Sequence, residues 1–266
     1  STSLAGSVNA RNTGGNIEFG ADLSQGRLRL DFDASLASDT LTVKRLVARS
    51  GSAALSAAGK LQLNAARRFE GAGSLARFDP AEFGAFPRAS MNAAFKAAGE
   101  LAPRWSAALE FALGDSRFQR RALGGSGRLV AAADRITEVD VNLSLGRNRA
   151  AARGSLGRSG DRLAIDIDAP QLEDSGAPVS GSLRAKGALS GAFASPGAEL
   201  TLEARSIALP GGERIASADA RVNLGEGAEP ALDLALQARG LANAQTELDA
   251  AQFTVRGTLA RRAIER

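Results

Sequence analysis

The chain has 266 residues, of which 33 are Lys or Arg and 29 are Asp or Glu, so its net charge is only +4. Hydrophobic residues make up 44%, which excludes an intrinsically disordered chain, and no apolar run approaches the roughly 18 residues of a membrane-spanning helix. The absence of His and Cys excludes Ser–His and Cys–His nucleophile systems, disulfides and the usual zinc ligands. We therefore expect no cofactor and no metal ion. Because acidic residues are interleaved with Arg throughout, nucleic-acid binding is not expected either.

The first clear element begins near residue 28, where Leu28, Leu30 and Phe32 alternate with Arg29 and Asp31. Strict alternation predicts a β-strand with one apolar and one polar face. The same alternation returns along almost the whole chain, and segments with a convincing helical period are few. The sequence therefore predicts an all-β protein.

Two long segments of this pattern are internal repeats. The segment LTVKRLVARSGSAALSAAGKL (41–61) aligns without a gap with ITEVDVNLSLGRNRAAARGSL (136–156), and AAFKAAGEL (93–101) matches GSLRAKGAL (181–189). The repeating unit is a strand, a short turn, and a second strand that ends in a small residue, Gly, any residue and Leu. We expect a single elongated, solenoid-like β-repeat region over residues 1–266, cut from a longer chain, with about 17 to 20 strands and no second domain.

Three shorter segments give local predictions. In FDPAEFGAF (78–86), Asp79 is placed to cap a helical turn that begins at Pro80, although an irregular loop fits equally well. The pair Gly114-Asp115 predicts a turn. The run GGSG (124–127) lacks the Gly-Lys-Ser/Thr of a phosphate-binding loop and is also predicted to be a hairpin turn.

In a meander, the apolar sides of all strands fall on one continuous face, which a second sheet, a bilayer or a ligand must cover. Aromatic residues are scarce, at 5% with one Trp and no Tyr, so a bilayer is the less favoured cover. The residues predicted to line this face are Leu28, Leu30, Phe32, Leu61, Leu63, Leu109, Phe111, Leu113, Val139, Val141, Leu143, Leu145, Leu163, Ile165, Ile167, Leu200, Leu202, Leu232, Leu234, Leu236, Phe253 and Val255.

Polar residues in the repeats have simpler explanations than catalysis. Asp166 and Asp168 share one face of a strand, as a calcium site or a glycosidase pair would require, but they are expected to form its solvent side. A basic stretch is expected on a solvated face rather than against lipid phosphates; it consists of Arg147, Arg149, Arg153, Arg158 and Arg162. Trp105 is expected to be an ordinary packed residue, with a groove lip as the alternative. No catalytic residue is expected.

Several segments of the sequence resemble sequences of the TamB family, which belongs to the AsmA-like superfamily. The most specific is FDPAEFGAFPRASMNAAFKAAGELAPRW (78–105), and DRLAIDIDAPQL (161–172), GSLRAKGALSGAFASPGAELTLEA (181–204) and FTVRGTLARRAIE (253–265) follow in order. The resemblance covers nearly the whole chain and suggests a middle portion, because the family's amino-terminal anchor and carboxy-terminal domain are not recognisable.

The resemblance implies a long sheet bent into a U, the open β-taco, with a continuous hydrophobic groove. It also implies a periplasmic protein of Gram-negative bacteria, anchored in the inner membrane, that moves phospholipid between the membranes and is linked to outer-membrane protein assembly. The implied partners are phospholipid acyl chains and an outer-membrane protein of the Omp85 class, TamA. Self-association through exposed edge strands is a further expectation.

Two alternatives to a lipid groove stay open on the residues alone. One is a structural or adhesin-type β-solenoid with a closed core. The other is a β-helix enzyme that processes polysaccharides, since such folds can work with Asp and Arg.

Overall fold

The computed structural model describes residues 5–82, 86–243 and 245–258. In this part of the chain it contains 17 β-strands and two short 3₁₀-helices. The all-β prediction is confirmed, and the strand count lies within the expected range. Neither helix is long or apolar enough to cross a bilayer. The chain divides into two compact units, Ser1–Ala133 and Asp134–Arg266, and the expectation of a single β-repeat region stays a prediction.

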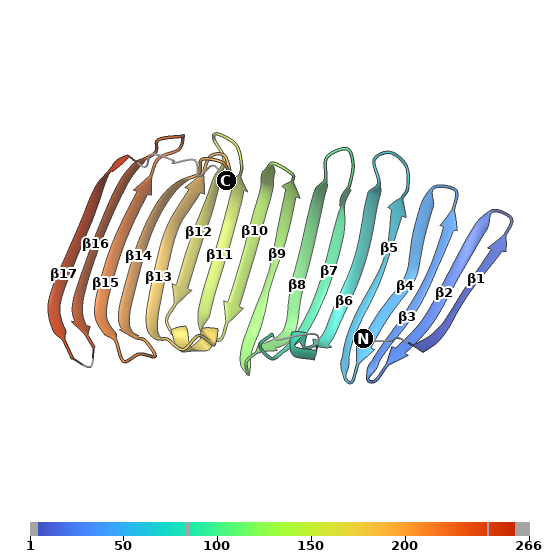
Figure 1. The fold of residues 1–266 in the computed structure, drawn as a ribbon, viewed down its shortest axis with the longest axis horizontal. Coiled ribbons are helices and arrows are strands. Elements are labelled where there is room, and N and C mark those ends of the chain that lie inside the picture. Colours follow the sequence, from blue (N-terminus) through green and yellow to red (C-terminus); the bar gives the residue numbers. More distant parts are fainter. Residues whose placement is uncertain (1–4, 83–85, 244, 259–266) are drawn as a thin grey trace, which may run out of the picture. The chain divides into compact units, whose positions relative to one another are not determined.

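The first unit is an antiparallel meander in which each strand pairs with its neighbours in sequence (Figure 1). Its strands are β1 (Ala5–Thr13), β2 (Asn16–Gln25), β3 (Leu28–Ala37), β4 (Thr40–Ser50), β5 (Ala53–Gln62), β6 (Arg68–Phe78), β7 (Ala89–Glu100), β8 (Ser106–Phe118) and β9 (Arg121–Ala132). The helix η1 (Pro80–Glu82) follows β6.

The second unit is a meander of the same kind. Its strands are β10 (Arg135–Leu145), β11 (Asn148–Leu156), β12 (Arg162–Ala169), β13 (Ser180–Ser190), β14 (Gly197–Ala208), β15 (Arg214–Leu224), β16 (Ala231–Ala242) and β17 (Glu247–Thr258). The helix η2 (Leu172–Ser175) follows β12.

The internal repeat seen in the sequence is a repeat of strands. Residues 41–61 form β4 and β5, whereas residues 136–156 form β10 and β11. Each copy continues with one more strand and then a 3₁₀-helix, η1 after β6 and η2 after β12. The repeating unit is therefore a hairpin, a third strand and a helical connection.

The glycine of the repeat has a packing role. A Cβ atom at Gly154 would lie 2.0 Å from the carbonyl oxygen of Arg162, and one at Gly187 would lie 1.9 Å from that of Glu199. The equivalent Gly59 and Gly99 meet the main chain of the following strand in the same way, at 2.5 and 2.0 Å. The repeat keeps Gly here because any side chain would collide with the neighbouring strand's backbone.

The predicted helical turn after β6 is confirmed. The Asp79 carboxylate accepts a hydrogen bond from the Ala81 amide at 3.0 Å, which caps the single turn Pro80–Glu82. The rest of the predicted segment includes residues 83–85, which lie outside the described residues.

Two predicted turns are wrong. Gly114-Asp115 lies inside β8, where the pairing with β9 shifts register between Leu113 and Ser116, so this pair forms a bulge. Residues 124–127 lie inside β9, where Gly125 pairs with Leu113 and Gly127 pairs with Phe111. The two glycines therefore oppose large apolar residues of β8 inside a strand and do not form a chain reversal.

Candidate functional site

The strand register places the predicted apolar residues of each unit on one face. Directly opposed residues of antiparallel strands share a face. In the second unit Ile165 opposes Ala152 on β11 and Gly187 on β13, and Leu234 opposes Val222 and Val255. In the first unit Phe111 opposes Phe95 and Gly127. Of the 22 predicted lining residues, all lie in strands on this face except Leu63, which directly follows β5. That the face lines a lipid groove stays a prediction.

The apolar face carries no charge through the middle of its strands. In the second unit, every second residue of 139–145, 163–169, 183–189, 198–204, 218–224, 232–238 and 251–257 is apolar or Gly. The equivalent positions of β3, which begin at Leu28 and end at Leu36, follow the same rule. This separation of residue types is what a face turned toward hydrocarbon requires.

No second layer covers the apolar face among the described residues. Among the described residues of the whole chain, nine hydrophobic side chains are buried, and six of them are Ala: Ala34, Val47, Ala53, Val139, Leu156, Ala169, Ala185, Ala188 and Ala238. Large residues of the face stay accessible, such as Leu143 at 39% and Phe253 at 55%. Soluble domains normally bury such a surface, and a large exposed apolar patch marks a binding surface.

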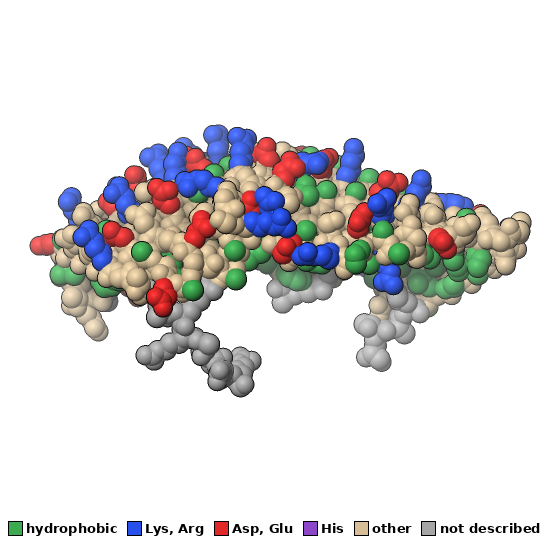
Figure 2. Space-filling view, turned by 90° about the horizontal axis from the view of Figure 1, so that it is seen from above, with side chains coloured by type: hydrophobic (Ala, Val, Ile, Leu, Met, Phe, Trp, Pro, Cys, Tyr) green, Lys and Arg blue, Asp and Glu red, His purple; other side chains and the backbone are tan. Residues whose placement is uncertain are grey.

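The opposite face carries the charges, and these are paired across strands. Arg184 contacts Asp168 and Lys186 contacts Asp166, each at 3.2 Å. Figure 2 shows basic and acidic side chains intermingled along the upper side of the view, and hydrophobic ones most densely gathered at its lower right. Asp166 and Asp168 therefore lie where the solvent-side interpretation predicts, each beside a basic partner.

The basic stretch follows the same rule for three of its five members. Arg153 pairs with Asp140 at 3.0 Å, and Arg162 pairs with Glu199 at 3.2 Å. Arg158 contacts Asp134 at 3.4 Å. Their partners, on β10, on β14 and in the β9–β10 turn, make these arginines part of the charged face and its rim.

A hollow of about 740 Å³ lies on the charged face of the first unit. Its floor contains alanines of β5 to β8, including Ala58 and Ala108, and its rim carries both lysines and glutamates. Both signs of charge therefore face the same space. This mixture provides no convergent set of groups for one ligand or one reaction.

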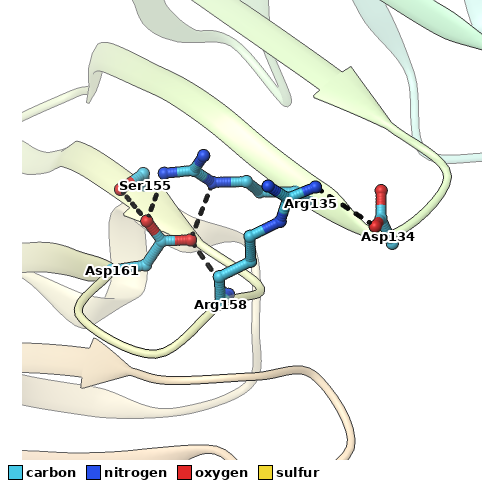
Figure 3. A network of polar contacts seen from close by, with 5 residues as sticks. All are labelled: Asp134, Arg135, Ser155, Arg158 and Asp161. Atoms are coloured by element: carbon cyan, nitrogen blue, oxygen red, sulfur yellow. Dashed lines mark hydrogen bonds and ion pairs between the residues drawn. The ribbon is translucent and has the colours of Figure 1, made fainter.

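A polar network joins the start of β10 and the turn before it to the end of β11 and the β11–β12 turn (Figure 3). The buried Asp161 carboxylate accepts two hydrogen bonds from the Arg135 guanidinium, at 3.0 and 2.6 Å. It also accepts one from the Ser155 hydroxyl and one from the Arg158 amide, both at 2.9 Å. The Arg135 hydrogen bonds, with those from Ser155 and Arg158, lower the pKa of Asp161 to about 2. The network fixes the β11–β12 turn against the start of β10.

At the other ends of these strands, η2 is tied back onto the β10–β11 turn. The Asn148 side chain donates to the Gln171 carbonyl at 2.6 Å and accepts from the Gln171 amide at 3.0 Å. The buried Asp174 carboxylate accepts from the Arg147 amide at 3.0 Å. Asn148 opposes Leu145 on the apolar face, so the connection meets the sheet on its apolar side. The connection therefore forms a lip along one border of that face.

The first unit has a similar contact at the equivalent place. The Ser50 hydroxyl, at the end of β4, donates to the Glu82 carboxylate of η1 at 3.3 Å. Sequence reasoning missed both lips. The available signal was a polar residue at a terminal apolar-face position of a strand, Ser50 at the end of β4 and Asn148 at the start of β11.

Comparison with known proteins gives one match. The family model described as TamB, N-terminal domain, matches residues 12–265. Neither the comparison with curated proteins nor the comparison with solved structures gives a match. The family match covers nearly the whole chain. It agrees with the resemblance to this family that segments such as residues 78–105 show. The chain therefore belongs to the family of TamB N-terminal domains.

Proposed function

We propose that this chain is a periplasmic lipid-transfer segment whose aliphatic face carries phospholipid acyl chains between the inner and outer membranes. The observation that supports the proposal is the apolar face itself, which lacks charge along its strands and has no covering layer in the described residues. Its side chains are mostly Leu, Val, Ile and Ala, which match hydrocarbon.

The energetics of lipid movement explain the value of such a surface. Each CH₂ group exposed to water costs about 0.8 kcal/mol, so two long acyl chains cost on the order of 20 kcal/mol or more. A continuous aliphatic face removes most of this cost at every step of the path. Because the strands of this face present no charged side chain to the acyl chains, the face also provides no site at which a lipid would bind tightly and stop.

Family membership supports a TamB-like role for the chain, in general terms lipid transport or outer-membrane assembly. The TamB family spans the periplasm, works with TamA and is not known as enzymatic. We propose that the full-length protein is anchored in the inner membrane. We further propose that it reaches TamA through parts of the protein outside residues 1–266, and that outer-membrane protein assembly depends on the lipid it delivers.

A closed-core scaffold is the second candidate. It requires the aliphatic side chains to be buried, whereas Leu143 and Phe253 are accessible. A polysaccharide-processing β-helix requires carboxylates that converge on one site, and Asp166 and Asp168 are each engaged by a basic side chain. Neither candidate accounts for an uncovered apolar face.

Site-specific photocrosslinking in cells tests the proposal. Ile165 and Asp166 are adjacent in β12 but lie on opposite faces, which makes them a matched pair for a photoreactive residue. We expect phospholipid adducts, identified by mass spectrometry, at position 165 and not at position 166. Equal labelling at both positions, or no lipid at position 165 in a folded protein, would exclude the aliphatic face as the lipid path.

A further inference from the structure

Exposed apolar side chains gather at one end of the first unit, in two neighbouring turns. Leu63 lies in the β5–β6 turn, and Leu101 and Trp105 lie in the β7–β8 turn; they are 48%, 52% and 46% exposed. These turns lie at the upper ends of their strands in Figure 1. We call residues 63–67 and 101–105 together the turn platform.

The platform is an ordered surface. The Leu101 amide donates to the Arg67 carbonyl and the Ala102 amide donates to the Ala66 carbonyl, both at 3.3 Å, so the two turns are hydrogen-bonded to each other. The Leu63 amide donates to the Asp39 carbonyl of the β3–β4 turn at 2.6 Å. Because backbone contacts hold the turns, their side chains are presented without a folding step on binding.

Charged side chains accompany the apolar ones, with a small excess of cations. Arg67 and Arg104 belong to the platform, and Arg68 at the start of β6 pairs with Glu100 at 2.7 Å. Together with Asp39, the neighbourhood holds three cationic and two anionic side chains. An aliphatic and Trp surface rimmed by Arg suits the border between water and lipid, where an indole ring and arginine stems lie in the headgroup region.

The platform also adjoins the apolar face. Leu101 directly follows β7 and Trp105 directly precedes β8, two residues from Gly99 and Ala107, which oppose each other on that face. At the opposite ends of the strands, η1 forms a lip instead. The apolar face of the first unit therefore adjoins an exposed apolar surface where β7 and β8 meet their turn.

We infer that the turn platform docks on the surface of a phospholipid bilayer, with Leu63, Leu101 and Trp105 in the headgroup region and the arginines against anionic headgroups. Such docking goes beyond the carriage of acyl chains, and it does not require that lipid move along the sheet. It would place the end of the apolar face directly against a membrane.

Trp105 is the only Trp in the sequence, so its fluorescence reports on the platform alone. The experiment mixes the 266-residue chain with vesicles of phosphatidylethanolamine and phosphatidylglycerol, and measures Trp emission and vesicle flotation. We expect a shift to shorter wavelength, quenching by brominated acyl chains, and protein that floats with the vesicles. Pure phosphatidylcholine vesicles or high salt should weaken the binding, because the arginines contribute less.

Matched variants separate the platform from nonspecific adhesion. The double variant Leu63→Asp, Leu101→Asp should bind vesicles at least about tenfold more weakly while keeping Trp105 as the reporter. Leu209→Asp changes a similarly exposed Leu, in the β14–β15 turn, and should bind like the unsubstituted chain. Docking is refuted if Trp emission does not change with vesicles, or if Leu209→Asp loses as much binding as the double variant.

A second control separates docking from lipid binding on the apolar face. A dispersed short-chain phospholipid, below the concentration at which it forms micelles, presents single molecules and no membrane. If this lipid shifts Trp emission but the protein does not float with vesicles, Trp105 contacts a single bound lipid and the docking inference fails, while the proposed function stands. If the protein floats with vesicles but no lipid crosslinks at Ile165, the docking inference stands and the proposed function fails.

Discussion

Arg135 and Asp161 form a two-point hydrogen-bonded ion pair that joins the first residue of β10 to the turn before β12. The Asp161 carboxylate is buried, and the Arg135 guanidinium is partly exposed. The pair fixes the position of the two hairpin ends through charge and geometry rather than through apolar packing, which is scarce in this chain.

Replacement of Asp161 by Asn should lower the thermal unfolding midpoint at neutral pH by several degrees, because it leaves Arg135 without its charged partner. The pKa of Asp161 is lower in the folded chain than in the unfolded chain, so its contribution is present above about pH 4 and is lost as the pH falls toward 2. The difference between the two proteins should shrink over this range in calorimetry. Asp140→Asn, at an exposed pair with Arg153, is the control and should change little.

Gly187 should not tolerate even a methyl group. Its Cβ would lie 1.9 Å from the Glu199 carbonyl oxygen and 2.8 Å from the Leu200 Cα, so Gly187→Ala forces β13 and β14 apart. We expect a loss of about 1–3 kcal/mol in the free energy of unfolding, measured by urea denaturation. Gly257→Ala provides the contrast, because no atom lies within 4 Å of the added group. Equal stability of the two variants would mean that the glycine of the repeat has no packing role.

Asn148→Ala should release the lip formed by η2. The substitution removes both hydrogen bonds to Gln171 and should cost about 1–2 kcal/mol of stability. Amide hydrogen exchange of residues 171–176 should become faster, with little change in β14 or β15. Asn142→Ala is the matched control, since that side chain lies on the charged face and bonds only weakly to Asp140, at 3.4 Å. Unchanged exchange in Asn148→Ala would show that Asp174 alone holds the lip.

Leu143→Arg tests the lipid path in the full-length protein. Leu143 is 39% exposed, so the long side chain can reach solvent and the fold should survive. A charge on the acyl path should raise the barrier to lipid passage by several kcal/mol, and each 1.4 kcal/mol slows passage about tenfold. Function should be lost at normal protein abundance, as measured by complementation of a transport-deficient strain.

Asn142→Arg adds the same charge to the opposite face and should complement fully. Full complementation by folded Leu143→Arg protein would show that lipid does not pass this position. Degradation of that variant would instead assign Leu143 to a closed core and favour the scaffold alternative.

Residue parity was enough to predict most of this fold. The alternation around Leu163, Ile165 and Ile167 specifies which side chains share a face, because a strand has a period of two residues. It also places Asp166 and Asp168 on the other face, where their ion pairs are found. Such local geometry depends only on neighbouring residues, so it can be predicted from the sequence without the tertiary structure.

Contacts between residues that are distant in the sequence could not be predicted from it. Gly125 and Gly127 suggested a turn, but they lie inside β9 opposite Leu113 and Phe111, and only the pairing with β8 explains them. The tether between Asn148 and Gln171 joins residues 23 positions apart, and its partner is a backbone group that no side-chain pattern reveals.

The meander has a consequence for how the chain reaches its folded state. Within each unit every strand pairs with the strand before it and the strand after it, so no pairing waits for a distant segment to be synthesised. Loop closure then costs little entropy at each step, and folding can begin at one hairpin and propagate strand by strand. A chain that emerges from a membrane pore amino terminus first could fold as it emerges. For the same reason, evolution can lengthen or shorten the sheet by whole hairpins without redesigning a core.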